Sequence, residues 1–190
     1  QCLAHIVELE AHRKEIASGI LQIAEPFSAV LDLLYTLPGF DKNPMTAIAI
    51  LSEIGPDMSV FPSSKHLVSW AGCCPRNDQS CQKVKSRRIS RAGSYLKPLL
   101  VQVANALIKS KKHPEFKERY HRIKSRRGHK KAIIAVCKML LTAIWNMLSK
   151  LEPYNPKGFL EHRPVKQEKT LTVSQALELL RLRGYTITNQ

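Results

Sequence analysis

Apolar side chains recur in alternating steps of three and four along the first 36 residues of the chain. Arg13 fills the one polar slot of this series. The spacing is typical of the seam of a coiled coil, and it predicts a long helix or a helical hairpin over residues 1–36. Pro26 should kink this helix, because proline cannot donate the backbone hydrogen bond. The seam pairs either with another protomer or with the chain's own core, and its members are Ile6, Leu9, Ile16, Ile20, Ile23, Phe27, Val30 and Leu34.

A second feature is the turn that follows this helix. The helix ends at Leu37-Pro38-Gly39, and an apolar helix resumes at Thr46-Ala47 and runs to Ile54. This order resembles the helix-hairpin-helix DNA-binding motif, in which a glycine turn and the N-terminal amides of the next helix face a backbone phosphate. The hairpin here is longer than the tight turn of that motif. The alternative interpretation is a helical turn that packs into a core.

Helical periodicity returns at intervals through the rest of the chain. The pair Ser63-Ser64 offers an N-cap for a short helix that stops at Ala71-Gly72. Residues 73–92 have no sustained period and predict a basic loop. Trp70 and Trp145 are expected to anchor the core. Further helices are expected at 93–110, 114–125 and 130–150, the last with the apolar face of a core helix.

The composition changes after Pro156. Residues 158–169 are polar and predict a linker, and Thr172 heads a capping box with Gln175 before a short helix that ends at Gly184. We therefore predict an all-α fold with a coiled-coil-like N-terminal helix, a helix-hairpin-helix-like segment and a basic loop. Its parts are a long connector helix over 1–36, a helical domain over 37–156, and a linker with a short C-terminal helix over 157–190.

Charge adds a functional expectation to this picture. The net charge is +15, and all of this surplus lies between Lys83 and Lys131, where 17 Lys and Arg accompany only two acids, Glu115 and Glu118. Such a field destabilises a fold by self-repulsion unless a polyanion offsets it. Neutralising phosphates also releases condensed counterions, so the stretch predicts DNA or RNA binding. The alternatives are a solvated basic face without a ligand and an acidic membrane surface, the latter disfavoured because no amphipathic basic helix with aromatic anchors accompanies it.

Several classes of protein are disfavoured by the sequence. Five cysteines, two of them adjacent, do not form a disulfide framework, and no CxxC or paired His/Cys spacing suggests a metal site. No apolar run approaches the roughly 20 residues of a membrane span. The first residues do not resemble a signal peptide, and without an initiator Met the chain looks like a piece of a longer protein. We expect reduced thiols and a cytoplasmic location.

An ordered set of short motifs runs over residues 30–160. Its members are Leu37-Pro38-Gly39, Glu53-Ile54-Gly55, Phe61, Leu67-Val68-Ser69-Trp70-Ala71-Gly72, Pro75, Asn77, Ser80, Lys83, Lys85-Ser86, Gly93, Leu96-Lys97, Tyr120, Arg126-Arg127-Gly128, Lys130-Lys131-Ala132 and Tyr154. In this order and spacing they resemble the insertion-sequence transposases that have an N-terminal RuvC-like DEDD domain and a C-terminal serine-bearing domain. That family is related to the Piv invertases, and its members are described as bridge-RNA-guided recombinases.

The resemblance implies a function and a catalytic residue. The family's serine corresponds to Ser80, which would cut and rejoin DNA strands through a covalent phosphoserine intermediate. The family usually has Glu-Ser-Ala-Gly or Ser-Ser-Gly at this place, whereas this chain has Gln79-Ser80-Cys81-Gln82. Carboxylates of the upstream DEDD domain would hold Mg²⁺, so this chain alone would bind no metal and be catalytically incomplete. The resemblance also implies DNA, a structured guide RNA, a homo-oligomer and a bacterial or archaeal cytoplasm.

The chemistry of the loop agrees with this role. A serine hydroxyl is a weak nucleophile that needs activation, and phosphodiester attack needs cations at the phosphoryl oxygens. Asp78 is the only carboxylate of the loop, which is too few for a two-metal site. The cations expected to bind nucleic acid are Lys83, Lys85, Arg87, Arg88, Arg91, Lys97, Arg126, Arg127, Lys130 and Lys131.

Two rival functions stay open. One is a non-catalytic helix-hairpin-helix module that binds nucleic acid, which explains the charge and the Leu-Pro-Gly turn but not the ordered motifs. The other is an inactive transposase remnant, which fits the altered residues on both sides of Ser80. The rival serines are Ser86, Ser90 and Ser94.

Overall fold

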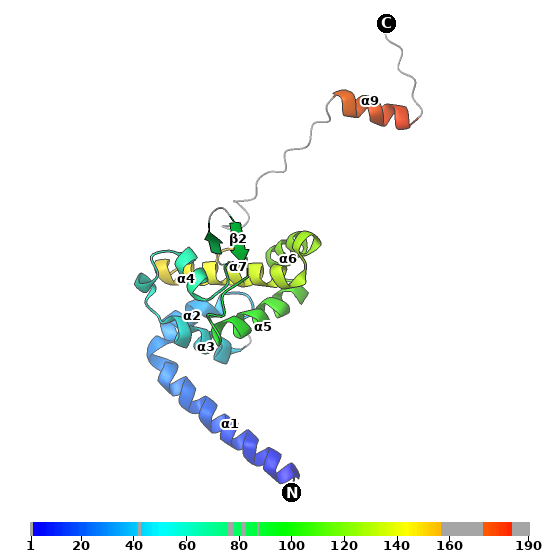
Figure 1. The fold of residues 1–190 in the computed structure, drawn as a ribbon. Helices are drawn as coiled ribbons and strands as arrows, with labels where there is room; N and C mark the ends of the chain where they lie inside the picture. Colours follow the sequence, from blue (N-terminus) through cyan, green and yellow to red (C-terminus); the bar gives the residue numbers. More distant parts are fainter. Residues whose placement is uncertain are drawn as a thin grey trace. The chain divides into compact units, whose positions relative to one another are not determined.

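The computed structural model describes residues 2–41, 43–75, 78–80, 83–86, 88–156 and 173–183. The chain divides into two compact units, Gln1–Pro156 and Lys157–Gln190. Most of the described residues are helical (Figure 1), and this confirms the predicted all-α fold class. The described elements are α1 (Cys2–Ala24), the 3-10 turn η1 (Glu25–Phe27), α2 (Ser28–Tyr35), α3 (Pro44–Ile54), η2 (Met58–Val60), α4 (Ser64–Trp70), β1 (Asp78–Ser80), β2 (Lys83–Ser86), α5 (Leu96–Lys109), α6 (Pro114–Arg127), α7 (His129–Lys150) and α9 (Val173–Leu182).

Helix α7 forms the centre of the first unit. Its apolar side chains recur in steps of three and four on more than one face, so other helices can pack against it from several sides. Helices α2, α4, α5 and α6 all contact it, and Figure 1 shows α7 in yellow among these neighbours. Burying each large apolar side chain contributes about 1.5–3 kcal/mol to folding. The fully buried residues of α7 are Ala132, Val136, Cys137, Leu140, Leu141 and Ile144.

Pro26 interrupts the N-terminal helix, as predicted. The chain runs as α1, passes through η1, which contains Pro26, and continues as α2. This break divides the predicted seam into two parts. Leu34 of α2 is fully buried in the helical unit, whereas Ala24 is the only buried residue of α1. Ile16 and Ile23 remain 65% and 76% exposed, so the seam of α1 has no partner in the described part of this chain.

The turn after α2 packs into the core. Leu37 and Phe40 are fully buried. Gly39 has a left-handed φ of +89°, and a Cβ at this position would lie 2.8 Å from Val103 Cγ1 of α5. Glycine is therefore required both by the backbone conformation and by the close approach to α5. These contacts favour the interpretation of a core turn over that of a phosphate-binding hairpin.

Short polar residues precede two of the helices, and one of them forms a side-chain cap. Helix α3 begins two residues before Thr46, because Asn43 Oδ1 accepts the Met45 N–H at 3.1 Å and Pro44 takes the first helical position. Helix α4 follows Ser63, as predicted. The Ser63 hydroxyl lies 2.9 Å from His66 Nδ1. The start of α3 was predicted at Thr46 because the prediction followed the apolar pattern and not the cap at Asn43.

The two tryptophans differ in burial. Trp145 of α7 is partly buried, and its Nε1–H donates to the Phe61 carbonyl at 3.0 Å. Trp70 is 46% exposed, with its ring edge-on to that of Phe61. The prediction that Trp70 anchors the core is therefore wrong. It is the last residue of α4, beyond Leu67 and Val68, which are the buried residues of that helix.

The stretch predicted as a basic loop contains a two-stranded antiparallel hairpin. Strands of three and four residues leave almost no apolar–polar alternation for a sequence pattern to reveal. An isolated bridge between Pro75 and Ile89 joins the same two arms of the chain. In the hairpin itself Asp78 is paired with Ser86, Gln79 with Val84 and Ser80 with Lys83, with an irregularity between Asp78 and Gln79.

The second unit contributes helix α9 to the description. This helix overlaps the short C-terminal helix expected from the sequence. The expected linker at 158–169, Thr172 and Gly184 lie outside the described residues.

Two helical stretches, Cys2–Tyr35 and His129–Lys150, are long and apolar enough to cross a membrane by length and composition alone. The core helix of a protein passes the same test. In His129–Lys150, 56% of the apolar window is buried inside the first unit, so core packing accounts for its composition. In Cys2–Tyr35 the apolar residues include those of the coiled-coil seam.

Candidate strand-cleavage site and nucleic-acid interface

Ser80 is the last residue of β1 and lies opposite Lys83, the first residue of β2. The hairpin therefore brings the backbone of the candidate nucleophile and of the first candidate cation to the same end of the ladder. Lys85 lies two residues further along β2. For these three residues the structure describes the backbone, and Arg87 lies outside the described residues.

The returning arm of the hairpin carries further cations. Arg88 and Arg91 follow β2 and are both exposed. They flank Ile89, whose bridge to Pro75 extends the pairing of the two arms beyond the hairpin. Predicted cations thus follow Ser80 along one arm, where a phosphate held near the hairpin would meet positive charge.

The hairpin joins the rest of the first unit through a narrow neck, where Gly72 and Gly93 come close together. Both glycines have a left-handed backbone, with φ of +67° and +66°. Lys97, in the first turn of α5, is partly buried at this neck, and its Nζ donates to the Ser90 carbonyl at 2.7 Å. The ammonium of Lys97 is therefore engaged inside the fold, unlike the exposed guanidinium-bearing residue Arg91.

A second basic cluster lies where α6 ends and α7 begins. Arg126 and Arg127 close α6, Lys130 and Lys131 lie in the first turn of α7, and all four are exposed. Gly128 joins the two helices with a φ of +82°, and nothing lies within 4 Å of the place a Cβ would take. Cations at the N-terminus of a helix are repelled by the positive end of its dipole. An anion bound there would interact favourably with the cations and with the dipole.

Helix α6 adds exposed cations that the sequence reasoning did not single out as site residues. Phe116 and Tyr120 are buried, so the cations occupy the rest of the helix surface. Reading the charge run with a helical period would have revealed them. They are Lys117, Arg119, Arg122 and Lys124.

Three arginines of α6 form what we call the arginine row: Arg119, Arg122 and Arg126. Their spacing of i, i+3 and i+7 places them on one side of the helix. The helix holds only two acids beside its cations, Glu115 and Glu118. Partial burial, and then the charge of Arg122, lower the pKa of Arg119. The row is thus a set of mutually repelling charges that a polyanion would stabilise.

Tyr120 fixes the junction between the two basic helices. Its side chain is buried, and its hydroxyl lies 2.8 Å from His129 Nδ1 at the start of α7. Lys124 Nζ lies 5.4 Å from the centre of the Tyr120 ring, within the range of a cation–π contact. Tyr120 therefore holds the shape of the basic junction and does not offer a free face for base stacking.

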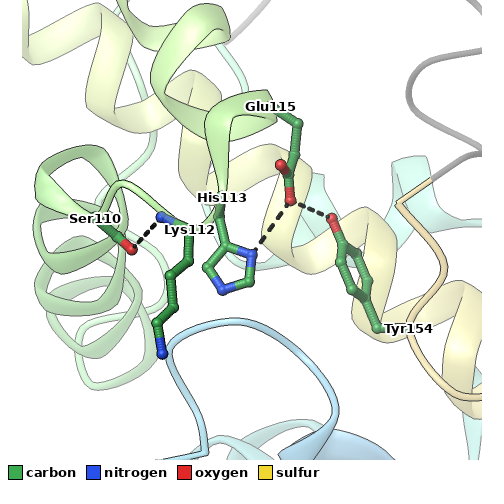
Figure 2. A network of polar contacts seen from close by, with 5 residues as sticks. All are labelled: Ser110, Lys112, His113, Glu115 and Tyr154. Carbon is green, nitrogen blue, oxygen red and sulfur yellow. Dashed lines mark hydrogen bonds and ion pairs between the residues drawn. The ribbon is translucent and has the colours of Figure 1, made fainter.

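Glu115, one of the two acids in the basic stretch, lies in a polar network (Figure 2). The Tyr154 hydroxyl donates to Glu115 Oε1 at 3.2 Å, and His113 Nδ1 lies 3.7 Å from the same oxygen. Burial, and then the charge of Glu115 and its hydrogen bond, raise the pKa of Tyr154. The Tyr154 N–H donates to Thr36 Oγ1 at 2.9 Å. The network ties the segment after α7 to the start of α6 and the end of α2.

Metal ligands are scarce in this arrangement. In the part of the chain that the structure describes, no three His, Cys, Asp or Glu side chains gather as a metal site.

The similarity found by comparison is to transposases and gene-inverting proteins. Residues 31–121 match the model of the family described as Transposase IS116/IS110/IS902 family. The matched segment contains both strands of the hairpin, Ser80, the neck at Gly72 and Gly93, and the first half of α6.

Two curated relatives are similar over a longer segment. The pilin gene-inverting protein of Moraxella bovis is 30% identical and that of Moraxella lacunata is 28% identical, each over 127 residues. The aligned segment is 66% of this chain and 38% of each relative. The chain therefore spans less than half the length of these relatives. No solved structure matches the chain.

Proposed function

We propose that this chain is the part of a DNA transposase or recombinase that supplies a serine nucleophile, Ser80, and binds nucleic acid around it. One observation carries the proposal: the family match contains the Ser80 hairpin and most of the stretch that holds the net positive charge. The relatives are named for inverting a gene, which makes DNA the expected substrate.

Strand cleavage at Ser80 is a transesterification. The serine Oγ bonds to phosphorus, the bond from phosphorus to one sugar oxygen breaks, and that oxygen takes up the proton that the serine loses. Attack by a sugar hydroxyl of another strand end reverses the step, rejoins the DNA and frees the serine. Cations of the returning arm, including Arg88 and Arg91, stabilise the negative charge that develops on the phosphoryl oxygens. Any Mg²⁺ that assists this step would be held by carboxylates of the upstream domain that the family resemblance implies.

The second basic cluster and the arginine row bind the phosphate backbone of DNA and of a structured guide RNA. Arginine and lysine on exposed helix surfaces position a nucleic acid without reading its sequence. When a guide RNA selects the target, base pairing supplies the specificity, and the protein needs to recognise chiefly backbone and shape. The exposed cations of α6 and of the α6–α7 junction support a role for the protein in binding the phosphate backbone, with sequence specificity left to base pairing.

The seam of α1 joins protomers into an oligomer. Its apolar residues are exposed along the helix, and they follow the spacing by which two helices interdigitate. Recombination joins two duplexes, so more than one Ser80 must be present in the active assembly. The exposed seam supports α1 as the contact between protomers.

The test is Ser80→Ala in the full-length protein, with Ser94→Ala, a change at an exposed rival serine, as the matched control. We expect Ser80→Ala to keep DNA and RNA binding but to form no covalent protein–DNA adduct on a denaturing gel, whereas the control forms the adduct. An adduct that persists in Ser80→Ala would show that another residue is the nucleophile.

The two rival functions give different results in the same experiment. A non-catalytic binding module or an inactive remnant yields no adduct even with the unaltered protein. The core contacts of Gly39 already weaken the case for a helix-hairpin-helix module, because the turn faces α5.

A further inference from the structure

The hairpin that carries Ser80 joins the helical unit through a neck formed by Gly72 and Gly93. A Cβ on Gly72 would lie 2.7 Å from the Ala92 carbonyl oxygen, and a Cβ on Gly93 would lie 2.5 Å from that of Ala71. Side chains other than hydrogen cannot be accommodated at these distances without displacing backbone. The outgoing and returning arms therefore pass each other at a separation that only glycine permits.

Lys97 closes this neck from α5. Its Nζ donates to the Ser90 carbonyl and would lie 2.9 Å from a Cβ on Gly72. Ser90 is also held through its hydroxyl, which accepts the Ala92 N–H at 3.0 Å. Burial raises the pKa of the nearby Cys73 thiol to about 11, and the charge of Lys97 opposes that rise. The ammonium thus lies among the atoms of the neck.

We propose that Lys97 is a positioning residue that holds the Ser80 hairpin in a fixed direction, and that it does not contact nucleic acid. This inference rests on the proposed function of Ser80. A hydrogen bond from a charged donor is stronger than one between neutral groups. The direction of a hairpin attached at a narrow neck depends on the few bonds made there, and a displacement of about 1 Å at a reacting group can slow a reaction by about 100-fold.

Arginine distinguishes this role from phosphate binding. A lysine that binds phosphate is replaced well by arginine, whose guanidinium binds phosphate with two hydrogen bonds. The ammonium of Lys97 lies beside Gly72 and donates to the Ser90 carbonyl, and we expect the larger planar guanidinium to displace the neck there. A positioning role therefore predicts that Lys97→Arg fails in the same way as Lys97→Met.

The first experiment compares these two variants in the full-length protein. At saturating DNA we expect both to form the covalent adduct about 100-fold more slowly than the unaltered protein. Their DNA affinity and its salt dependence should stay unchanged. Normal adduct formation by Lys97→Arg would overturn the proposal. So would a fall of about one in the salt slope of Lys97→Met, which is the signature of a lysine that binds phosphate.

Lys131 provides the matched lysine control. It is exposed in the first turn of α7 and is a candidate phosphate ligand. Lys131→Met should weaken DNA binding, and Lys131→Arg should not, which shows that the assay detects the removal of a phosphate-binding cation.

A second pair of variants tests the neck without altering a charge. Gly72→Ala would push against Lys97 and the Ala92 carbonyl, so it should reproduce the slow adduct formation. Gly55→Ala is the control, because Gly55 also has a left-handed φ, +75°, but a Cβ there would meet nothing within 4 Å. Equal adduct formation by the two glycine variants would overturn the proposal.

Hydrogen exchange tests the neck independently of serine chemistry. The Cys73 N–H donates to the Val68 carbonyl at 3.0 Å, directly beside the neck. Its exchange should quicken in Lys97→Met and in Gly72→Ala, while the amides of α7 exchange as before. Unchanged exchange at Cys73, or faster exchange that extends into α7, would overturn the proposal. If Ser80 is not the nucleophile, this measurement still decides what Lys97 does.

Discussion

Glu115 shows how one carboxylate can persist in a stretch that holds 17 Lys and Arg. An exposed acid would compete with phosphate for the neighbouring cations. The side chain of Glu115 is only 9% exposed, and it accepts a hydrogen bond from the Tyr154 hydroxyl. It also lies in the first turn of α6, where a negative charge is favourable to the helix dipole. Glu115 therefore stabilises the fold without reducing the basic surface.

Tyr154→Phe removes the donor of this hydrogen bond and keeps the ring. The free energy of unfolding at pH 7 should fall by about 1–3 kcal/mol, because a nearly buried carboxylate loses its partner. The pKa of Tyr154 is raised in the folded state from 10.0. The stabilisation is therefore complete below that pH and shrinks above it, where the unfolded phenol ionises first. Urea unfolding of both proteins at neutral and alkaline pH measures this, and a pH-independent difference would contradict it.

Residue types were easier to predict than the directions of side chains. Sequence motifs could propose Ser80 and the cations that follow it as candidates. They could not show that the ammonium of Lys97 turns inward, because that depends on Ser90 being brought beside α5 by the glycine neck. Trp70 was misplaced for a related reason: an apolar residue at the end of a short helix lies beyond the face that the helix buries.

Among the elements, the helices followed the sequence pattern and the hairpin did not. Apolar periodicity and the interrupting residues Pro26, Gly72 and Gly128 placed the helices of the first unit to within a few residues. The hairpin contains strands too short to show a period, and its pairing depends on arms that meet at the neck. The start of α3 was missed because the cap at Asn43 lies outside the apolar pattern.

The arginine row makes a prediction about helix α6. Replacing both Arg119 and Arg122 with Gln keeps helix propensity similar and removes two of the proposed phosphate-binding groups. DNA affinity should fall for all sequences alike, and the slope of log K against log salt should become shallower by about 0.9 for each phosphate that the variant no longer neutralises. Fluorescence titrations over a range of salt concentrations measure this. Lys65→Gln, an exposed cation outside the basic stretch, is the control. An unchanged slope in the double variant would exclude the row from the interface.

In the proposed function, different parts of the first unit bind nucleic acid and join protomers. The net positive charge arises from residues 83–131, whereas the exposed apolar seam belongs to α1. The two proposed functions therefore use different physical interactions. Phosphate binding weakens as salt is added, and burial of an apolar seam does not.

This separation predicts a selective effect of changes in α1. Ile16→Lys combined with Ile23→Lys should convert an oligomer into a monomer, because each places a charge in the apolar seam. Ser18→Lys adds a charge to the same helix away from the seam and should leave the assembly intact. Sedimentation velocity of the full-length protein distinguishes the variants. A seam variant that sediments like the unaltered oligomer would show that α1 is not the contact.

The break at Pro26 has a consequence for the design of this protein. Since Ala24 is the only buried residue of α1, the packed core does not depend on how long that helix is. Adding or removing seven residues changes its length by about 10 Å and rotates the seam by only about 20°. A change of five residues would instead turn the seam by about 140°. In the proposed assembly, helix α1 therefore acts as a spacer whose length can change in heptad steps while the candidate DNA-binding residues stay as they are.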